Sequence, residues 1–317
     1  MKVTINKIKI SGISACVPRQ QRFFSDTPET VRITRSTGIH SVRIVEASQD
    51  AETLAVAAAA NLLEKLNINQ EELGALVWVS QSPSKPMPYG AARLARALGL
   101  STHAAVLDIA SGCAGYIQGI LQGALMIQAG AASKVLVLAA EANSRIIHPD
   151  DASLAMLFGD AGTATLLEQG TESMGFEMHH DGSGDAFLTT NAQGLLTMDG
   201  MEVFQFSIQR VPELLKSLCE THGLSIKQVP LFAMHQANAF ILQYIAKKMK
   251  LSEEQMPFLA DGFGNTGPAS IPLLLCVLSE QQRLPNQIVM AGFGIGLQWG
   301  GAIASMADAQ VLPVQII

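Results

Sequence analysis

The pattern of hydrophobic and polar residues predicts the same series of strands and helices twice along the chain. In each half, an apolar strand-like run precedes a helical run, a segment that opens a buried helix, and another apolar strand. In the first half these segments are 72–80, 91–100, 104–115 and 133–141, and in the second they are 227–238, 240–251, 256–270 and 286–294. The last strands begin 153 residues apart, and aligning Val77 with Phe232 gives an offset of 155. The agreement of these offsets predicts an internal duplication of strand–helix units.

Continuous apolar strands that alternate with helices are typical of sheets covered on both faces. We therefore expect an α/β fold of two similar halves, residues 1–168 and 169–317, with mostly parallel strands. Segment 1–18 alternates polar and apolar residues like a strand and lacks the continuous apolar core of a signal peptide. The most apolar stretch, 54–63, is too short to span a membrane and is expected to form a buried helix.

Composition and charge exclude several classes of protein. The 317 residues are 48% hydrophobic and 15% charged, which is typical of a folded globular protein. A net charge of −6 and the absence of a long Lys/Arg run argue against nucleic acid or a membrane as partner. The spacing of the cysteines predicts neither a disulfide nor a structural zinc site, and a reducing cytoplasm fits them. They are Cys16, Cys113, Cys219 and Cys276.

One cysteine differs from the others in its setting. Cys113 lies in DIASGCAGY, where an apolar strand gives way to an apolar helix and where Gly112 and Gly115 permit tight backbone geometry. The start of a helix favours thiolate over thiol, so this segment is typical of a nucleophile. The other three cysteines are interpreted as small buried hydrophobic residues.

Two polar residues of the second half are candidates to work with Cys113. His235 ends an apolar strand, and its neighbours Gln236 and Asn238 indicate that this strand end opens into a polar pocket. Asn265, in GFGNTGPASIP, either shares that site or merely caps the helix that follows. The duplication places Asn265 opposite Cys113, and sites in α/β sheets gather at the carboxyl ends of strands. We therefore expect these side chains to meet where the halves join.

Two other motifs are not interpreted as ligand sites. The glycine-rich segment 291–301 follows a strand but lacks the Lys-Ser/Thr of a P-loop and the acidic residue of a dinucleotide site. We expect it to bring a backbone N–H beside a reacting carbonyl oxygen. The run His179 to Asp181 is interpreted as a solvated loop, because consecutive histidines in a glycine-rich segment seldom point at one metal ion.

These motifs together resemble those of a known family. DIASGCAGY, HQAN, GNTGPASIP, FGDAGTA, GFGIGLQWG and TGIHSVRI have the order and spacing of the β-ketoacyl-acyl carrier protein synthase III family, of the thiolase fold. The resemblance spans nearly the whole chain and implies two duplicated halves in the layers α-β-α-β-α. It also implies a homodimer that uses acyl carrier protein, an acyl thioester primer and a malonyl thioester, without a metal or redox cofactor.

Position by position, the resemblance implies that Cys113 is the acylated nucleophile and that His235 and Asn265 complete the catalytic set. The backbone N–H groups of Cys113 and Ile295 would bind the oxyanion of the acylation step. His235 and Asn265 would then stabilise the enolate that forms when the malonyl thioester loses carbon dioxide. The carbanion would attack acyl-Cys113 and give a 3-oxoacyl thioester.

The chain departs from the family pattern at positions that bind the primer. Arg32 and Ala152 stand where typical members have the tryptophan and arginine that sandwich the adenine of coenzyme A, which argues against a coenzyme A primer. Ile295 replaces the middle glycine of the glycine-rich loop and still supplies an N–H. Met87 stands where the family has a residue that reaches the acyl pocket of the partner subunit, and its flexibility suits an unusual chain.

The helical segment after HQAN also differs from the family pattern. Asn238 and Phe240 are expected in the substrate pocket, and Phe240 replaces a basic residue that helps to dock the carrier protein. Lys247, Lys248 and Lys250 remain nearby on the same predicted helix and are expected to take over the docking. Together the departures favour a synthase of a specialised lipid or secondary-metabolite pathway over the ordinary initiator of fatty acid synthesis.

Two other functions remain open. Cys113 could pass its acyl group to an alcohol or amine, although simple transfer needs a base more than the enolate-stabilising pair His235 and Asn265. Alternatively, the chain is a non-catalytic subunit that binds acyl carrier protein, but such a subunit would not need an intact nucleophile. A papain-like thiol hydrolase would use the same residue types, and the duplicated α/β pattern is wrong for it.

Overall fold

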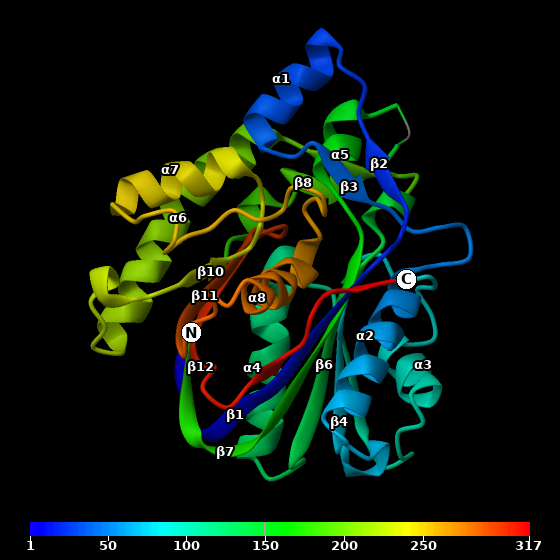
Figure 1. Cartoon of the computed structure of the whole chain (residues 1–317), viewed down its shortest axis with the longest axis vertical. Helices are drawn as coiled ribbons and strands as arrows, with labels where there is room; N and C mark the ends of the chain where they lie inside the picture. Colours follow the sequence, from blue (N-terminus) through cyan, green and yellow to red (C-terminus); the bar gives the residue numbers. More distant parts are fainter. Residues whose placement is uncertain (149) are drawn as a thin grey trace.

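Two long strands join the two halves of the molecule (Figure 1). β1 (Lys2–Val17) and β7 (Ala161–His180) pair antiparallel along most of their length. The first part of β7 also pairs with a strand of the first half, and its last part with a strand of the second half. The structure is a computed structural model that describes residues 1–148 and 150–317. One continuous sheet therefore serves both halves.

The strands of this sheet follow the order β10-β11-β12-β7-β6-β4-β5, with β1 beside β7. The bounds of the others are β4 (Ala75–Val79), β5 (Ala105–Ile109), β6 (Lys134–Glu141), β10 (Phe232–Met234), β11 (Gln287–Gly294) and β12 (Gln298–Ser305). β4/β5, β4/β6 and β10/β11 are parallel pairs, as are those of β1 with β13 (Gln310–Val311) and β14 (Gln315–Ile316), whereas β7 is antiparallel to β1, β6 and β12, and β11 to β12. The sheet is therefore mixed, and the expected parallel pairing fails for the long strand β7 and for β12. β11 and β12 are joined by a short turn, and such a turn connects only antiparallel neighbours.

The structure confirms the internal duplication. Each half has a short 3-10 turn that leads into an inner helix, η2 (Gly112–Ala114) into α4 (Gly115–Gln128) and η6 (Gly267–Ala269) into α8 (Ser270–Glu280). The two turns begin 155 residues apart, and β6 and β11 begin 153 residues apart. The first residues of the turns, Gly112 and Gly267, both have positive φ, 51° and 58°. The same backbone bend therefore recurs at the same place in each half.

Helices form three layers around the two parts of the sheet (Figure 1). α4 packs against β4 and β6 on one side and against β11 and β12 on the other, and α8 packs against β1, β7 and β10. α2 (Ala51–Lys65) and α3 (Gly90–Ala97) cover the outer face of the first half, while α6 (Gly200–Thr221) covers that of the second with α7 (Ala239–Met249) beside it. The predicted α-β-α-β-α arrangement is confirmed. The division after residue 168 falls inside β7 and stays a prediction.

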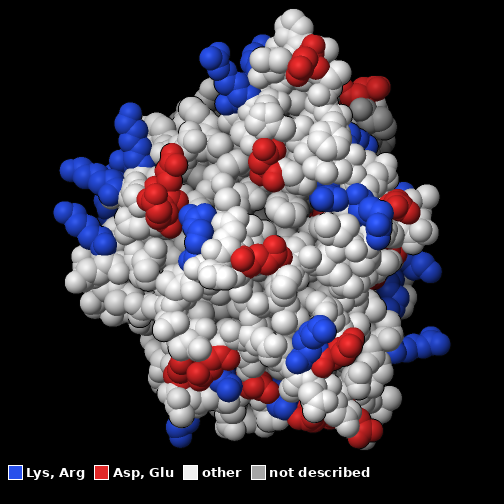
Figure 2. Space-filling model, viewed as in Figure 1, with Lys and Arg blue, Asp and Glu red and all other residues white. Residues whose placement is uncertain are grey.

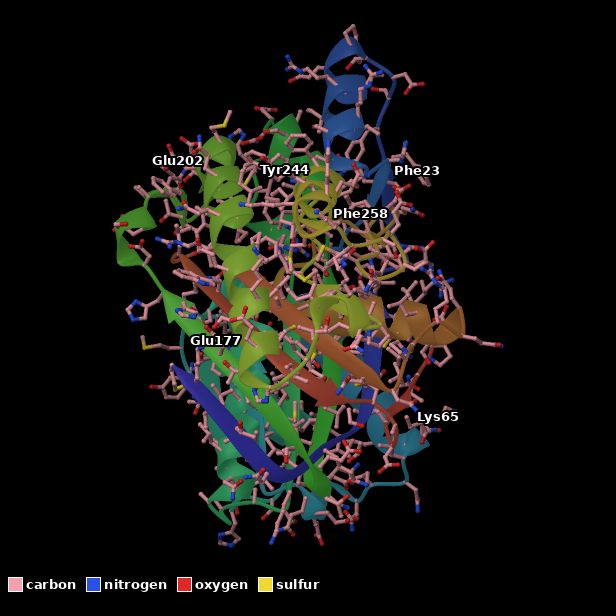
Figure 3. All side chains as sticks on the ribbon, turned by 90° about the vertical axis from the view of Figure 1, so that its left-hand side faces the viewer. Phe23, Lys65, Glu177, Glu202, Tyr244 and Phe258 are labelled. Atoms are coloured by element: carbon pink, nitrogen blue, oxygen red, sulfur yellow. The ribbon has the colours of Figure 1, made fainter. Side chains whose placement is uncertain are left out.

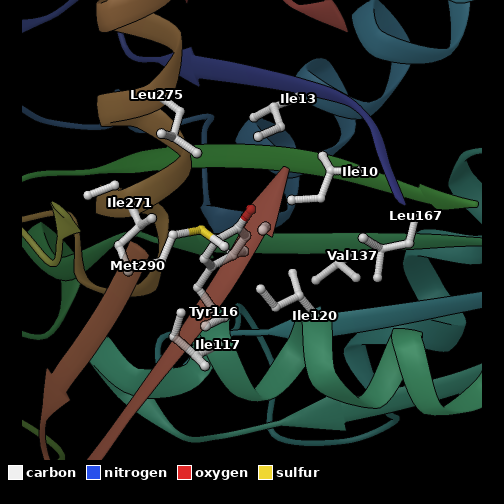
Figure 4. Close-up of a cluster of buried hydrophobic side chains, with 14 of the residues drawn as sticks. Ile10, Ile13, Tyr116, Ile117, Ile120, Val137, Leu167, Ile271, Leu275 and Met290 are labelled. Atoms are coloured by element: carbon white, nitrogen blue, oxygen red, sulfur yellow. The ribbon is translucent and has the colours of Figure 1, made fainter. Parts of the chain in front are cut away.

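The middle layer holds the largest hydrophobic cluster (Figure 4). Ile117 and Ile120 of α4, Ile271 and Leu275 of α8, and Met290 of β11 are completely buried in it. Each such side chain contributes about 1.5–3 kcal/mol relative to an exposed one. α4 is apolar nearly all round because sheet lies on two sides of it. The two helices whose N-terminal ends carry the candidate residues are therefore held rigidly.

The remaining elements lie around this framework. At one end of it are β2 (Gln21–Phe23), α1 (Pro28–Thr37), β3 (Ser41–Arg43), α5 (Ala152–Leu157), β8 (Leu188–Thr190) and β9 (Leu196–Met198). The other short elements are η1 (Gln70–Glu72), η3 (Asn143–Arg145), η4 (Gly182–Gly184) and η5 (Ile226–Gln228). Apolar side chains from β3, α5, β8 and β9 form a separate buried cluster at this end.

The structure decides three local expectations. Segment 1–18 is largely the strand β1, and 54–63 lies within the buried helix α2. None of the helices in the described residues is long and apolar enough to cross a bilayer. His179 and His180 end β7, so the expected loop is wrong for these two residues and begins only at Asp181, although His180 is exposed to solvent as expected. Nε2 of His179 lies 2.8 Å from the buried carboxylate of Glu177, and its ring stacks on Trp299 at 5.2 Å, because this segment pairs with β12 in the sheet.

Candidate active site

Cys113 lies on a tight turn at the N-terminal end of α4. A Cβ on its neighbour Gly112, which has a φ of 51°, would lie 2.1 Å from Cγ2 of Ile295. A Cβ on Gly294, the last residue of β11, would lie 3.2 Å from Sγ of Cys113. The loop after β11 can approach the thiol this closely only because both positions are glycine.

The side chain of Cys113 is almost completely buried, with 7% of the residue exposed. Burial, followed by the carboxylate of Glu141, raises the pKa of Cys113 to about 12, and a hydrogen bond from its own backbone N–H opposes this. A rise from 9.0 to about 12 corresponds to about 4 kcal/mol, more than the ~2 kcal/mol that a helix N-terminus supplies at most. Burial of the thiol therefore opposes the effect of the helix N-terminus, and the thiolate expected from the sequence stays a prediction.

His235 follows β10 directly and is buried as a neutral ring. Its backbone N–H donates to the carbonyl oxygen of Ala291 at 2.8 Å, and its Nδ1 lies 2.7 Å from Oγ of Ser270. That Oγ also accepts the backbone N–H of Gln236 at 3.3 Å. Burial lowers the pKa of His235 to about 3, although a hydrogen bond to the backbone of Gly267 works against this. The ring is therefore neutral and carries a single N–H that it can donate.

Asn265 lies two residues before η6, the turn of the second half that is equivalent to the turn carrying Cys113. Its Oδ1 accepts the backbone N–H of Gly267 at 3.0 Å, and its Nδ2 lies 3.4 Å from the carbonyl oxygen of Ala237. The cap position itself belongs to Thr266. Because a side-chain amide has two N–H groups, Asn265 can fasten the turn and still offer one N–H to a ligand.

The structure brings the three predicted catalytic side chains together. Cys113, His235 and Asn265 line one cavity of about 70 Å³. A second cavity, of about 330 Å³, meets the first at Cys113 and is lined by Ile295 among others. The thiol therefore lies between a small cavity with two neutral hydrogen-bond donors and a larger cavity without either of them.

Glu141, the last residue of β6, also lines the larger cavity, although its position in the sequence suggested no role. It is 2% exposed, and its carboxylate accepts the backbone N–H groups of Gln81 and Ser82, each at 2.9 Å, and the hydroxyl of Ser80 at 3.3 Å. Burial raises the pKa of Glu141 to about 7 despite these bonds. The sequence signal that could have identified Glu141 is its position as a charged residue at the end of an apolar run in β6.

Gln236 and Asn238 have different environments. Gln236 is 3% exposed, and its amide bonds the backbone at Met234 (2.9 Å) and Leu259 (2.8 Å). It belongs to no open polar pocket, so that expectation is wrong for this residue. Asn238 caps α7 by accepting the backbone N–H of Ile241 at 2.8 Å, and it also lines the smaller cavity.

The other predicted substrate and docking residues lie on the surface. Met87, in the loop before α3, is 81% exposed, and Phe240 on α7 is 53% exposed. Neither is among the described residues that line the two cavities. Lys247 and Lys248 are exposed in the last turn of α7, and Lys250 ends the helix in a left-handed conformation.

The position expected to bind adenine borders a third cavity. This cavity, of about 400 Å³, lies between α5 and the segment leading into α1, and Ala152 lines it together with Phe24 and His148. Arg32 is exposed on α1. The structure therefore places Ala152 at a surface hollow and Arg32 on the helix above it.

The chain is similar to known proteins over almost its whole length. Residues 107–182 match the family model described as 3-oxoacyl-(acyl-carrier-protein) synthase III, and residues 219–306 match the model of its C-terminal part. The β-ketoacyl-(acyl-carrier-protein) synthase III of Streptococcus sanguinis is 33% identical and covers 95% of this chain with 100% of its own length.

Solved structures agree with these matches. A 3-oxoacyl-(acyl-carrier protein) synthase from Burkholderia xenovorans LB400 superimposes with a TM-score of 0.95 at 31% identity, over 100% of this chain and 99% of its own. The priming β-ketosynthase of the R1128 polyketide pathway gives 0.87 at 26% identity, over 98% and 97%. The chain therefore belongs to the β-ketoacyl-acyl carrier protein synthase III family, whose members are thiolase-fold condensing acyltransferases.

Proposed function

We propose that this chain condenses an acyl thioester with malonyl-acyl carrier protein, and that Cys113, His235 and Asn265 are its catalytic residues. The observation that carries the proposal is the single cavity lined by all three side chains. Two of them lie at the mouths of the equivalent inner helices, and the third ends a neighbouring strand.

In the first step, the sulfur of Cys113 attacks the carbonyl carbon of the primer thioester. A new C–S bond forms, the C–S bond to the carrier breaks, and the thiol proton leaves with the carrier thiol. The backbone N–H of Cys113 and that of Ile295, in the turn between β11 and β12, would stabilise the tetrahedral oxyanion. The close approach of Gly294 to the sulfur supports this arrangement.

In the second step, the malonyl thioester loses carbon dioxide and negative charge develops on its thioester oxygen. The ring N–H of His235 and an N–H of Asn265 are neutral donors, so they stabilise that charge without protonating the carbanion. The burial that lowers the pKa of His235 to about 3 supports this role, because an imidazolium would quench the carbanion. The carbanion then attacks the carbonyl carbon of acyl-Cys113, a C–C bond forms and the C–S bond to Cys113 breaks. The 3-oxoacyl thioester leaves, and the Cys113 thiolate takes up a proton from water.

Intact-mass measurement with acyl-carrier-protein and acyl-coenzyme A thioesters tests the first step. We expect an acyl adduct that is lost in Cys113→Ala and kept in the matched control Cys219→Ala, whose sulfur lies buried in α6. His235→Ala and Asn265→Ala should still acylate but release no carbon dioxide from the malonyl thioester. Acylation without carbon dioxide release in the wild-type protein would indicate transfer to an alcohol or amine instead.

The carrier protein is proposed to dock on α7. Figure 2 shows basic side chains along the edge of the molecule where Figure 1 draws this helix, and Lys247 and Lys248 are exposed there. We expect Lys247→Glu to raise the KM for a carrier-borne substrate several-fold and to leave that for a coenzyme A thioester unchanged. Lys65→Glu, on the distant helix α2 (Figure 3), is the control. Equal KM values in the two variants would contradict docking at α7.

The primer is proposed to arrive on the carrier protein, in a specialised lipid or secondary-metabolite pathway. Ala152 leaves a hollow where an arginine would contact adenine, and Arg32 supplies no aromatic face for stacking. Preferential acylation by carrier thioesters supports this; ready acylation by acetyl-coenzyme A would point back to ordinary initiation of fatty acid synthesis.

A cytoplasmic homodimer is also part of the proposal. β5 is the end strand of the sheet, Val106 on it is 40% exposed, and the nearby Met87 and Tyr89 are 81% and 72% exposed. A sheet edge with exposed apolar side chains is suited to pairing with a second copy. Sedimentation should show a wild-type dimer and a weakened one in Val106→Lys. A wild-type monomer would contradict the proposal.

A further inference from the structure

The two cavities that meet at Cys113 divide the substrates between them. The smaller cavity contains His235 and Asn265, which are placed to act on the malonyl thioester. The larger cavity shares Cys113, Phe158 and Leu188 with the smaller one but is lined by neither His235 nor Asn265. An acyl group carried on Sγ while malonyl thioester occupies the smaller cavity must therefore extend into the larger one.

The larger cavity has a mixed lining. Its apolar part consists of Ile146, Phe158, Leu188, Leu196 and Ile295. Two polar side chains of the lining, Glu141 and Asn143, form hydrogen bonds with the surrounding backbone. The other polar side chains that line it are Gln81, Asp185, Thr189 and Thr190. Covering such groups with a plain hydrocarbon chain costs free energy, because their hydrogen bonds to water are lost without replacement. This lining is better matched to an acyl group that itself carries a polar substituent.

Gln81 is the polar side chain of this cavity that lies against the turn carrying the nucleophile. Its backbone N–H is held by the buried carboxylate of Glu141 at 2.9 Å, which fixes the start of the loop after β4. Its Oε1 lies over the turn of Cys113, so close that a Cβ on Gly112 would be 2.6 Å away. The side-chain amide makes no hydrogen bond to any residue that the structure describes. Its oxygen is therefore available to a bound acyl group beside the sulfur.

We propose that Gln81 selects a short acyl group with a hydrogen-bond donor, a hydroxyl or an amine, a few atoms from the thioester carbon. This rests on the proposed acylation of Cys113 and names the class of primer. A volume of about 330 Å³ is at the lower end of the range for small-molecule pockets, about 300–1,000 Å³, which agrees with a short chain. Oε1 of Gln81 accepts a hydrogen bond from this hydroxyl or amine. The hydroxyl or amine itself does not react when the acyl group is transferred to Sγ of Cys113.

Matched pairs of thioesters test this proposal. The second-order rate constant for acylation of Cys113 is measured by intact mass with butyryl- and 3-hydroxybutyryl-carrier protein, in the wild type, Gln81→Met and Gln70→Met. Gln81→Met keeps the length of the side chain and removes its hydrogen-bonding groups. Gln70 lies on the exposed turn η1, away from the cavities, and serves as the control. The ratio of the two rate constants does not depend on the fraction of active protein.

We expect the wild type and Gln70→Met to favour the hydroxylated primer, and Gln81→Met to lower that preference by about 2- to 12-fold, the worth of one net hydrogen bond. An equal ratio in all three proteins would overturn the role of Gln81 and leave the proposed condensation intact. A protein that no thioester acylates would overturn both. A wild-type preference for the butyryl primer would overturn the proposed selection of a hydroxylated acyl group.

Discussion

The buried carboxylate of Glu141 makes a quantitative prediction about pH and stability. Its pKa is about 7 in the folded protein, against an ordinary value of 4.5. Between these values the folded protein holds more protons on Glu141 than the unfolded chain does, so the free energy of unfolding falls as pH rises. The total loss is about 3 kcal/mol at about 1.4 kcal/mol per pKa unit, and most of it occurs between pH 5 and pH 8.

Glu141→Gln removes this titration and leaves the other ionisable groups in place. Urea unfolding of both proteins at several pH values between 5 and 8 gives the difference in unfolding free energy, in which the other groups cancel. That difference should shift in favour of the variant by about 2 to 3 kcal/mol as pH rises from 5 to 8. The variant should also lower the pKa of the Cys113 thiol, because the carboxylate raises it. A difference that stays constant with pH would refute the reasoning.

Three further substitutions test the framework. Gly294→Ala places a methyl group 3.2 Å from Sγ of Cys113 and should slow acylation by about 100-fold in intact-mass kinetics; a wild-type rate would show that the loop can move away. Ser270→Ala leaves Nδ1 of His235 without its partner and should lower the free energy of unfolding in urea by about 1–3 kcal/mol, with slower decarboxylation; unaltered decarboxylation would show that His235 does not need this hydrogen bond. Leu275→Ala should lower the free energy of unfolding by about 2–5 kcal/mol in the same assay. A smaller loss would mean that neighbouring side chains of the middle layer move in to fill the space left by Leu275.

Much of the fold was predictable because apolar patterning is a local signal. The repeat spacing of 153 to 155 residues reappears in the turns and inner helices, since each half must bury the same faces in the same order. The direction of the strands was not predictable in the same way. A buried strand is apolar on both faces whether its neighbours run parallel or antiparallel, so β7 and β12 gave no warning of a mixed sheet.

The site was partly predictable for a related reason. Cys113 and Asn265 were recognisable because glycines mark the turns before both inner helices, and His235 because polar residues follow its strand. The cavity around these residues was not predictable, because it depends on packing between segments far apart in the chain. The same holds for the amide of Gln81 and the carboxylate of Glu141, which line the larger cavity. The segment at His179 was misread because its partner strand lies more than a hundred residues later in the sequence.

The sequence by itself therefore determined the order of the elements, the duplication, and the residue types able to form an acyl-enzyme and stabilise an enolate. Only the tertiary structure decided the pKa values of those groups and the shape of the space around them. The reason is physical: side-chain chemistry belongs to the residue, whereas desolvation adds up over all neighbours. Burial raises the pKa of the Cys113 thiol and keeps His235 neutral, and no pattern within either segment contains the neighbours that cause it.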